Sequence, residues 1–236
     1  MGKSSRNKAE RRQERDREAT IAAATRRPER RIPVFWIAIG LAVALGLVAI
    51  VVTGRDDAKP DAAPDAPAFG DVTVTGDPLP TFENEGDDPA VGERAPLLTG
   101  TGIDNEPVKI APQEGGYVLV AMAHWCPHCR KEIPLIVAAQ GEGELPSEVQ
   151  VFGLATATSE SQPNFPPAEW LADENWTYPT MVDDEAGTAA EAIGLEGYPF
   201  FLFVNGDGTV ADRASGELEM GDLAERMRKL EPVIAN

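Results

Sequence analysis

An uncharged run of 20 residues, from Pro33 to Val52, constrains this chain more than any other feature of its sequence. At about 1.5 Å per helical residue the run spans roughly 30 Å, the thickness of the hydrocarbon core of a bilayer. It is longer than the apolar core of a signal peptide, and no small-residue cleavage site follows it directly. A buried helix of a soluble domain would keep a polar face over this length. The sequence therefore predicts a transmembrane helix at residues 33–53.

Basic residues flank this run on one side only. Residues 1–31 carry 11 Lys/Arg against 5 Asp/Glu, whereas the rest of the chain carries 10 against 34. The positive-inside rule places a basic tail, residues 1–32, in the cytoplasm and the chain after about residue 53 outside it. The mixed charges of the tail favour a role in fixing topology over nucleic-acid binding. We therefore expect a single-pass protein of the cell membrane whose folded part is extracytoplasmic.

The segment after the predicted helix differs in composition from the rest of the chain. Residues 54–88 are rich in Asp, Ala and Pro and poor in large apolar side chains, a composition typical of an extended linker. The sequence of residues 72–89 does not indicate their role. From residue 89 onward, apolar runs alternate with turn signals, and we expect one folded domain over residues 89–236.

The apolar pattern of that domain predicts a mixed β-sheet covered by helices, which is an α/β fold. The order is a β-hairpin, then β-α-β-α, then two strands and a closing helix. Strands are expected in a hairpin at 96–110 and at 117–123, 150–156, 180–182, 200–204 and 209–214. Helices are expected from the cysteines to about Gln140, at 167–174, at 186–192 and along the stripe Leu223, Met227, Leu230 and Ile234.

The two cysteines of the chain lie together in the motif Trp125-Cys126-Pro127-His128-Cys129. The motif follows an apolar strand and opens a helix. The first sulfur then lies at the helix N-terminus, where free N–H groups and the helix dipole stabilise negative charge. Residues i and i+3 face each other across a helical turn. We therefore expect Cys126 to supply the attacking thiolate and Cys129 to resolve the mixed disulfide.

Other uses of two cysteines fit the motif less well. A zinc site would need His124 and His128 as further ligands, but natural sites usually join two separated pairs. A c-type haem site needs His after the second cysteine, where this chain has Arg130. A structural disulfide remains open, although a bridge across two residues removes little entropy from the unfolded chain. We expect no metal and no organic cofactor.

Three segments resemble the TlpA/ResA-like family of membrane-anchored thioredoxins. Residues 117–136, YVLVAMAHWCPHCRKEIPLI, resemble the active-site strand and helix, including the C-R-K-E-x-P run. Residues 91–110 resemble the N-terminal hairpin of the family, and residues 197–210 its cis-proline strand and turn. The resemblance implies a thioredoxin fold facing the cell envelope, with Cys126 as nucleophile. It also implies that Tyr198-Pro199 is a cis bond packed against the cysteines.

The sequence departs from these relatives at two positions. Cytoplasmic thioredoxins have a buried Asp below the cysteines, and the matching residue here is Val120. The dipeptide Pro127-His128 is similar to that of DsbA-type oxidases, whereas envelope reductases commonly have Pro-Pro. Because His128 would add a hydrogen bond or positive charge to the Cys126 thiolate, it favours an oxidant. Many TlpA-like proteins instead reduce clients during cytochrome c maturation, and this direction is the alternative.

We therefore predict a membrane-anchored thiol–disulfide oxidoreductase that exchanges the Cys126–Cys129 disulfide with cysteines of envelope proteins. A membrane redox partner would recycle the pair. Trp125 is expected to shield the disulfide, and His124 to be an ordinary loop residue. The alternative of another class is a non-catalytic binding module on a thioredoxin scaffold, against which the retained cysteine pair argues. A thiol peroxidase would need a proline–threonine motif before its cysteine, and none precedes Cys126.

Overall fold

The central strand of the domain, β4 (Tyr117–Met122), is buried along its whole length. In the computed structural model, which describes residues 66–84 and 86–232, β4 lies in the middle of a five-stranded sheet of order β6-β5-β4-β7-β8. On one side it pairs in parallel with β5 (Gln150–Ala155), which pairs in parallel with the edge strand β6 (Thr180–Val182). On the other side it pairs antiparallel with β7 (Phe200–Val204), followed by β8 (Val210–Ser215).

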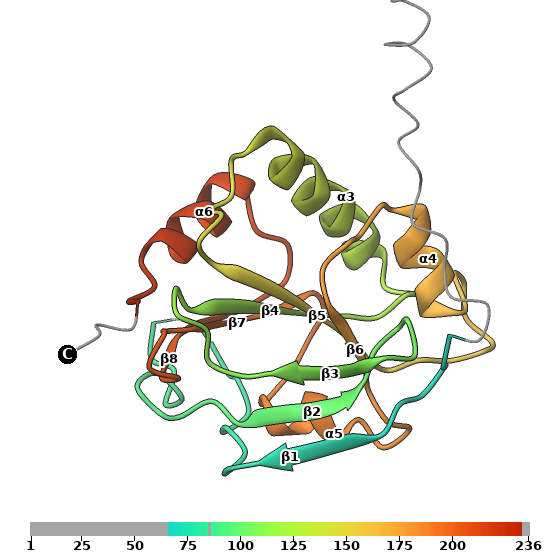
Figure 1. Ribbon diagram of the computed structural model, residues 1–236, viewed down its shortest axis with the longest axis horizontal. Helices are drawn as coiled ribbons and strands as arrows, with labels where there is room; N and C mark the ends of the chain where they lie inside the picture. The colour runs from blue at the N-terminus through green and yellow to red at the C-terminus, as the bar shows by residue number, and fades with distance from the viewer. Residues whose placement is uncertain (1–65, 85, 233–236) are drawn as a thin grey trace, which may run out of the picture. The chain divides into compact units, whose positions relative to one another are not determined.

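Helices and a second sheet cover the two faces of this sheet (Figure 1). Helices α3 (Pro127–Glu142), α4 (Pro167–Asp173) and α6 (Met220–Arg228) lie on one face. The short helix α5 (Thr188–Ala192) lies on the other, with a three-stranded antiparallel sheet of order β1-β2-β3. Its strands are β1 (Val72–Thr75), β2 (Leu97–Thr101) and β3 (Pro107–Ile110).

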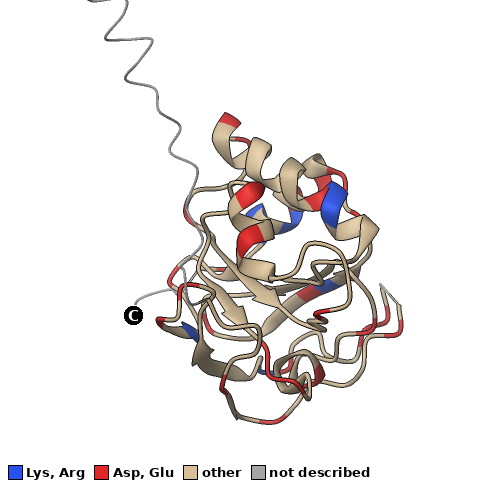
Figure 2. Ribbon diagram, turned by 90° about the vertical axis from the view of Figure 1, so that its right-hand side faces the viewer, with Lys and Arg blue, Asp and Glu red and all other residues tan. Residues whose placement is uncertain are grey.

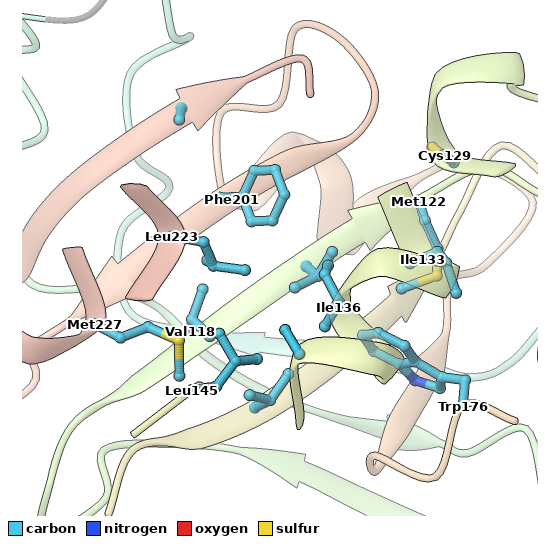
Figure 3. Packing of buried hydrophobic residues seen from close by; sticks show 14 of the residues in the cluster. Val118, Met122, Cys129, Ile133, Ile136, Leu145, Trp176, Phe201, Leu223 and Met227 are labelled. Atoms are coloured by element: carbon cyan, nitrogen blue, oxygen red, sulfur yellow. The ribbon is translucent and has the colours of Figure 1, made fainter. Parts of the chain in front are cut away.

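Two hydrophobic cores form because alternate side chains of a strand point to opposite faces. From β4, Val118, Val120 and Met122 enter the core under α3, α4 and α6, part of which Figure 3 shows. Tyr117, Leu119 and Ala121 enter the other core, with residues of α5, β2 and β3. This burial on both faces explains why the strand reads as a continuous apolar run.

The predicted fold is confirmed as a thioredoxin-like α/β domain with an N-terminal hairpin sheet. The expected hairpin forms from β2 and β3, and each expected strand and helix occurs within a few residues of its predicted bounds. The closing helix α6 ends at Arg228, and Ile234, the last residue of its expected stripe, lies outside the described residues.

The fold begins earlier in the chain than the expected boundary at residue 89. Within the predicted 54–88 linker, Val72–Thr75 form β1 and pair with β2. The Leu79 and Phe82 side chains are buried in the core that contains α5. Their backbone N–H groups donate to the carbonyl oxygens of Ala192 and Gly194 at 2.9 Å each. The Asp/Ala/Pro-rich composition concealed this segment because only a few apolar side chains anchor it.

A buried ion pair fixes the end of that segment to the sheet. The Arg213 guanidinium on β8 donates to both carboxylate oxygens of Asp88, at 2.5 and 2.8 Å. It also donates to the carbonyl oxygens of Pro80 and Ile193, at 2.8 and 3.0 Å. The hydrogen bond from Arg213 holds the pKa of Asp88 below its usual value. Breaking a buried pair of this kind usually destabilises a protein by about 3–5 kcal/mol, so Arg213 is a major determinant of the fold.

Acidic residues are spread over the loops and helices of the domain, with few Lys or Arg between them (Figure 2). Within the described residues, no helix is long and apolar enough to cross a membrane. The predicted basic tail at 1–32 and transmembrane helix at 33–53 lie outside those residues.

Candidate functional site

The cysteine pair lies at the start of α3, four residues after the end of β4 at Met122. Cys126 is the N-cap residue of α3, with an extended backbone, and Pro127 follows it at the start of the helix. Pro suits this position because the first helical N–H groups have no partner within the helix. The Cys126 carbonyl accepts from the Arg130 N–H at 3.1 Å and so closes the first turn. A thiolate on Cys126 therefore faces the unpaired N–H groups and the positive end of the helix dipole.

The two thiols differ in access to solvent. Cys126 is 6% exposed, whereas Cys129 is fully buried, and both are free thiols. Burial raises the pKa of the Cys129 thiol, and the nearby charges of Cys126 and Glu132 raise it further. Cys126 is therefore the sulfur that a client protein can reach. Cys129 needs a proton acceptor before it can attack.

Tyr198 and Trp125 lie beside Cys126. The Cys126 thiol donates to the Tyr198 carbonyl oxygen at 3.8 Å, and the Tyr198–Pro199 bond is cis, as the family resemblance implied. The Trp125 ring packs edge-to-face on the Tyr198 ring, with centroids 6.0 Å apart. Its Nε1–H donates to the Ala157 carbonyl oxygen at 2.8 Å. These contacts hold the Trp125 and Tyr198 rings beside the cysteine pair.

His124 is a structural residue of the neighbouring loop. Its ring is buried, and Nδ1 lies 2.6 Å from the Pro163 carbonyl oxygen, which can only accept. Nε2 accepts from the Ser159 N–H at 3.1 Å. These two bonds fix the neutral tautomer with the proton on Nδ1, and burial lowers the pKa of the ring. His124 therefore orders residues 159–163, and neither nitrogen is available to shuttle protons.

His128 has a different partner from the one the sequence suggested. Its Nδ1 lies 2.5 Å from Oε1 of Glu217, in the loop between β8 and α6. Lys131 contacts the same oxygen at 3.3 Å. The hydrogen bond from His128 lowers the pKa of Glu217. In this arrangement the imidazole is bound to a carboxylate and not to the Cys126 sulfur.

Glu132 is a site residue that the sequence reasoning missed. Its side chain is buried, with Oε1 accepting from the Leu218 N–H at 3.2 Å. Burial raises its pKa to about 7. Val120, at the position of the buried Asp of cytoplasmic thioredoxins, lies in the same core as the cysteines and has no ionisable group. The Glu132 carboxyl lies on the active-site helix, and its charge raises the pKa of Cys129. Its place three residues after Cys129, inside an apolar stripe, was the signal for it.

No metal centre is visible around these residues. Across the described ranges, 66–84 and 86–232, no group of three or more His, Cys, Asp or Glu side chains could hold a metal ion. The two histidines that a zinc site would need have other hydrogen-bond partners. His124 binds the loop at 159–163, and His128 binds Glu217. The arrangement suits sulfur exchange between two thiols and a disulfide.

A thioredoxin-like fold with a redox-competent cysteine pair at the start of its active-site helix defines a thiol–disulfide oxidoreductase. Comparison with known proteins agrees with this class. The chain belongs to the AhpC/TSA family, whose model matches residues 91–213. The resemblance to the TlpA/ResA-like thioredoxins is thereby confirmed.

Individual relatives are distant in sequence. The thiol:disulfide interchange protein DsbE of Pasteurella multocida is 25% identical over 155 residues, which cover 62% of this chain and 81% of that protein. A structure from Chlorobium tepidum, described as thiol:disulfide interchange protein DsbE, is 20% identical with a TM-score of 0.50, covering 58% of this chain and 95% of that one. A DsbF homologue from Corynebacterium diphtheriae is 23% identical with a TM-score of 0.49, covering 64% and 99%. At these identities the Chlorobium structure supports the fold alone.

The difference in burial between the two thiols predicts a difference in their reactivity. In the reduced protein at mildly acidic pH, iodoacetamide should modify Cys126 at least about tenfold faster than Cys129, because the thiolate is the reacting species. Peptide mass spectrometry over a time course measures both rates. Cys129→Ser should also accumulate mixed disulfides with clients through Cys126. Preferential labelling of Cys129 would reverse the two assignments.

The pKa of Glu132, at about 7, predicts a pH dependence of exchange. As pH rises through 7 the carboxyl ionises and becomes able to take the Cys129 proton, so the rate should rise with an inflection near pH 7. Glu132→Gln should lose this inflection and slow exchange about 100-fold at pH 7.5, within the usual range for general-base catalysis. The measurement is the rate of insulin disulfide reduction by dithiothreitol between pH 5.5 and 8.5.

Stability provides an independent readout of the same carboxyl. The raised pKa means that the folded state holds the Glu132 proton more tightly than the unfolded chain does. This contribution to stability is present below about pH 4.5 and is lost as pH rises through 7. Glu132→Gln should flatten that part of the stability–pH curve. The exposed Glu142→Gln, at the far end of α3, is the matched control and should change neither profile. An unchanged rate profile in Glu132→Gln would exclude Glu132 as the base.

Proposed function

We propose that this protein reduces disulfides of client proteins outside the cytoplasm, from a membrane anchor at residues 33–53. The observation that carries the enzymatic part is the placement of the two sulfurs. Cys126 lies at the N-terminus of α3, within reach of solvent, and Cys129 lies one turn deeper and fully buried. A binding module on the same scaffold would not need this division between the two sulfurs.

The exchange begins when the Cys126 thiolate attacks one sulfur of a client disulfide. A Cys126–client mixed disulfide forms, and the other client sulfur leaves as a thiolate and takes up a proton. Cys129 then loses its proton to Glu132 and attacks the Cys126 sulfur. The second client sulfur is released, and the Cys126–Cys129 disulfide forms. The client gains two electrons and the enzyme loses two, so a membrane redox partner must supply two electrons to restore the thiols.

The geometry favours reduction over the oxidant reading that His128 suggested. That reading required the imidazole to stabilise the Cys126 thiolate, because whatever stabilises the reduced form makes the disulfide a stronger oxidant. In the structure the imidazole is bound to Glu217. The resemblance to TlpA-like reductases and the match to a DsbE protein support the same direction. We therefore take the reductase alternative, including a role of the cytochrome c maturation type, as the better proposal.

Client access is available beside Tyr198. A cavity of about 420 Å³ opens there, lined on one side by Thr156, Ala157 and Thr158 and on the other by residues of α5 and the loop before it. The Tyr198 carbonyl oxygen meets the Cys126 sulfur, and the Ala157 carbonyl oxygen holds Trp125. Tyr198 therefore connects this cavity with the Cys126 sulfur, and we propose the cavity as the place of an extended client segment.

The reduction potential of the Cys126–Cys129 pair tests the direction of electron flow. For a reductase we expect a value near or below that of thioredoxin, about −270 mV, after equilibration of the full chain with glutathione or dithiothreitol buffers. His128→Pro should change it little, because the imidazole N–H is already engaged with Glu217. A wild-type value near about −120 mV, in the range of DsbA, would restore the oxidant reading.

The location is tested by protease accessibility. If residues 33–53 span the membrane with the basic tail inside, protease added to intact spheroplasts should remove residues 90–236, and sequencing of the mature protein should show an intact N-terminus. A chain in which the basic residues between positions 26 and 31 are replaced by acidic ones is the control and should lose this fixed orientation. Protection of the domain in intact spheroplasts would contradict the proposed location, and a mature N-terminus after about Val52 would contradict the anchor.

A further inference from the structure

The loop between β8 and α6, residues 216–219, contacts the active-site helix at two points. On the outer side, the Glu217 carboxylate binds His128 at 2.5 Å and Lys131 at 3.3 Å. On the inner side, the Leu218 N–H donates to the buried Glu132 carboxyl. The loop therefore contacts both His128, one of the two residues between the cysteines, and the acid proposed to take the Cys129 proton.

The direction of the hydrogen bond between His128 and Glu217 follows from the chemistry of the two groups. An ionised carboxylate can only accept, so the imidazole Nδ1 must carry the proton and donate it. The Cys126 thiol has a separate partner, the Tyr198 carbonyl oxygen. Among the described residues, Glu217 is the hydrogen-bond partner of the His128 ring.

We propose that Glu217 is a positioning residue that keeps the cysteine pair reducing by holding the His128 imidazole away from the Cys126 sulfur. The inference rests on the proposed reductase function and extends it from the cysteines to Glu217, which lies 89 residues after His128 and 86 after Lys131. Glu217 does not touch the reacting sulfurs, and it acts through His128.

The redox consequence follows from the relative stability of thiolate and disulfide. A free imidazole beside the helix N-terminus would donate to the Cys126 thiolate and favour the reduced protein, making the disulfide a stronger oxidant. When Glu217 binds that donor, this extra stabilisation of the thiolate is removed. The pair then gives up its electrons more readily, as a reductase requires.

If the contact between His128 and Glu217 only stabilised the fold, its removal would change the stability of the protein and not its redox equilibrium. The His128 and Glu217 side chains are 61% and 37% exposed, and exposed ion pairs contribute little to stability because water and salt screen them. Removing Glu217 should therefore leave the unfolding midpoint almost unchanged. Its effect should appear in the redox equilibrium, where the His128 interaction differs between the reduced and oxidised forms.

The test measures the equilibrium between the full-length protein and glutathione, in which the protein dithiol and glutathione disulfide yield the protein disulfide and two glutathione molecules. Glu217→Ala should lower the equilibrium constant for forming the protein disulfide about tenfold, a shift of about 30 mV for a two-electron couple. In a His128→Ala background, the same substitution should change the constant less than about twofold.

Glu219→Ala is the matched control. Glu219 lies in the same loop, and its charge, like that of Glu217, raises the pKa of Glu132. It has no described contact with His128, so its removal should change the constant less than about twofold. The control separates an effect transmitted through His128 from a general loss of negative charge near Glu132.

A spectroscopic readout follows the imidazole itself. The chain has only two histidines, so two pairs of imidazole signals, from Nδ1 and Nε2 of each ring, are expected in a nitrogen-15 spectrum. The His128 signal should show a protonated Nδ1 in the wild type and change in Glu217→Ala, while the His124 signal stays fixed. An unchanged His128 signal would contradict the contact in solution.

Three outcomes of the equilibrium would overturn the proposal. An unshifted constant in Glu217→Ala would remove the redox role, and an equal shift with and without His128 would show that Glu217 acts through its own charge. An equal shift in Glu219→Ala would assign the effect to charge near Glu132. Wild-type protein that exchanges disulfides while Glu217→Ala shows no shift leaves the proposed function intact. Wild-type protein that exchanges none would contradict the proposed function instead.

Discussion

The burial of β4 on both faces is the constraint on which the rest of this structure depends. Its alternate side chains enter two separate cores, so a helical layer must cover one face, and α5 with the three-stranded sheet must cover the other. The strand ends at Met122, and the chain leaves the centre of the sheet at the point where α3 can begin. The cysteine pair is placed at this exit, at the N-terminus of a helix that packs on the central strand.

Much of this arrangement could be predicted from the sequence because it is local. The apolar run of β4, the spacing of Cys126 and Cys129, and the hairpin turn between β7 and β8 each occupy a short stretch of chain. The pairing of β1 with β2 could not be predicted, because the alternation of Val and Thr in β1 covers only four residues and lies next to an Asp/Ala/Pro-rich segment. A few apolar contacts and backbone hydrogen bonds from a distant strand stabilise it.

The partners of the charged and ionisable side chains at the site could not be predicted for a related reason. His128 was visible in the motif, but its effect depends on Glu217, which is 89 positions away. Glu132 was visible only as part of a family-like run, because sequence alone did not show that its carboxyl is buried against Leu218. A motif indicates which reactive groups are present, whereas the charges around them follow from long-range folding. The direction of electron transfer depends on these charges, so a motif that by itself favours an oxidant can belong to the reductase that we propose.

The ion pair between Arg213 and Asp88 has a consequence for where this domain can be separated from the rest of the chain. Residues 79–88 look like spacer, yet they supply the Asp88 carboxylate and the Pro80 carbonyl oxygen that surround the guanidinium. A fragment cut at residue 89, where the folded composition begins, would keep every catalytic side chain and leave a fully buried Arg213 charge without its acid. A fragment that keeps both of these partners of Arg213 must therefore begin before Pro80. A cut chosen from the change in composition alone would remove the charge that balances the guanidinium.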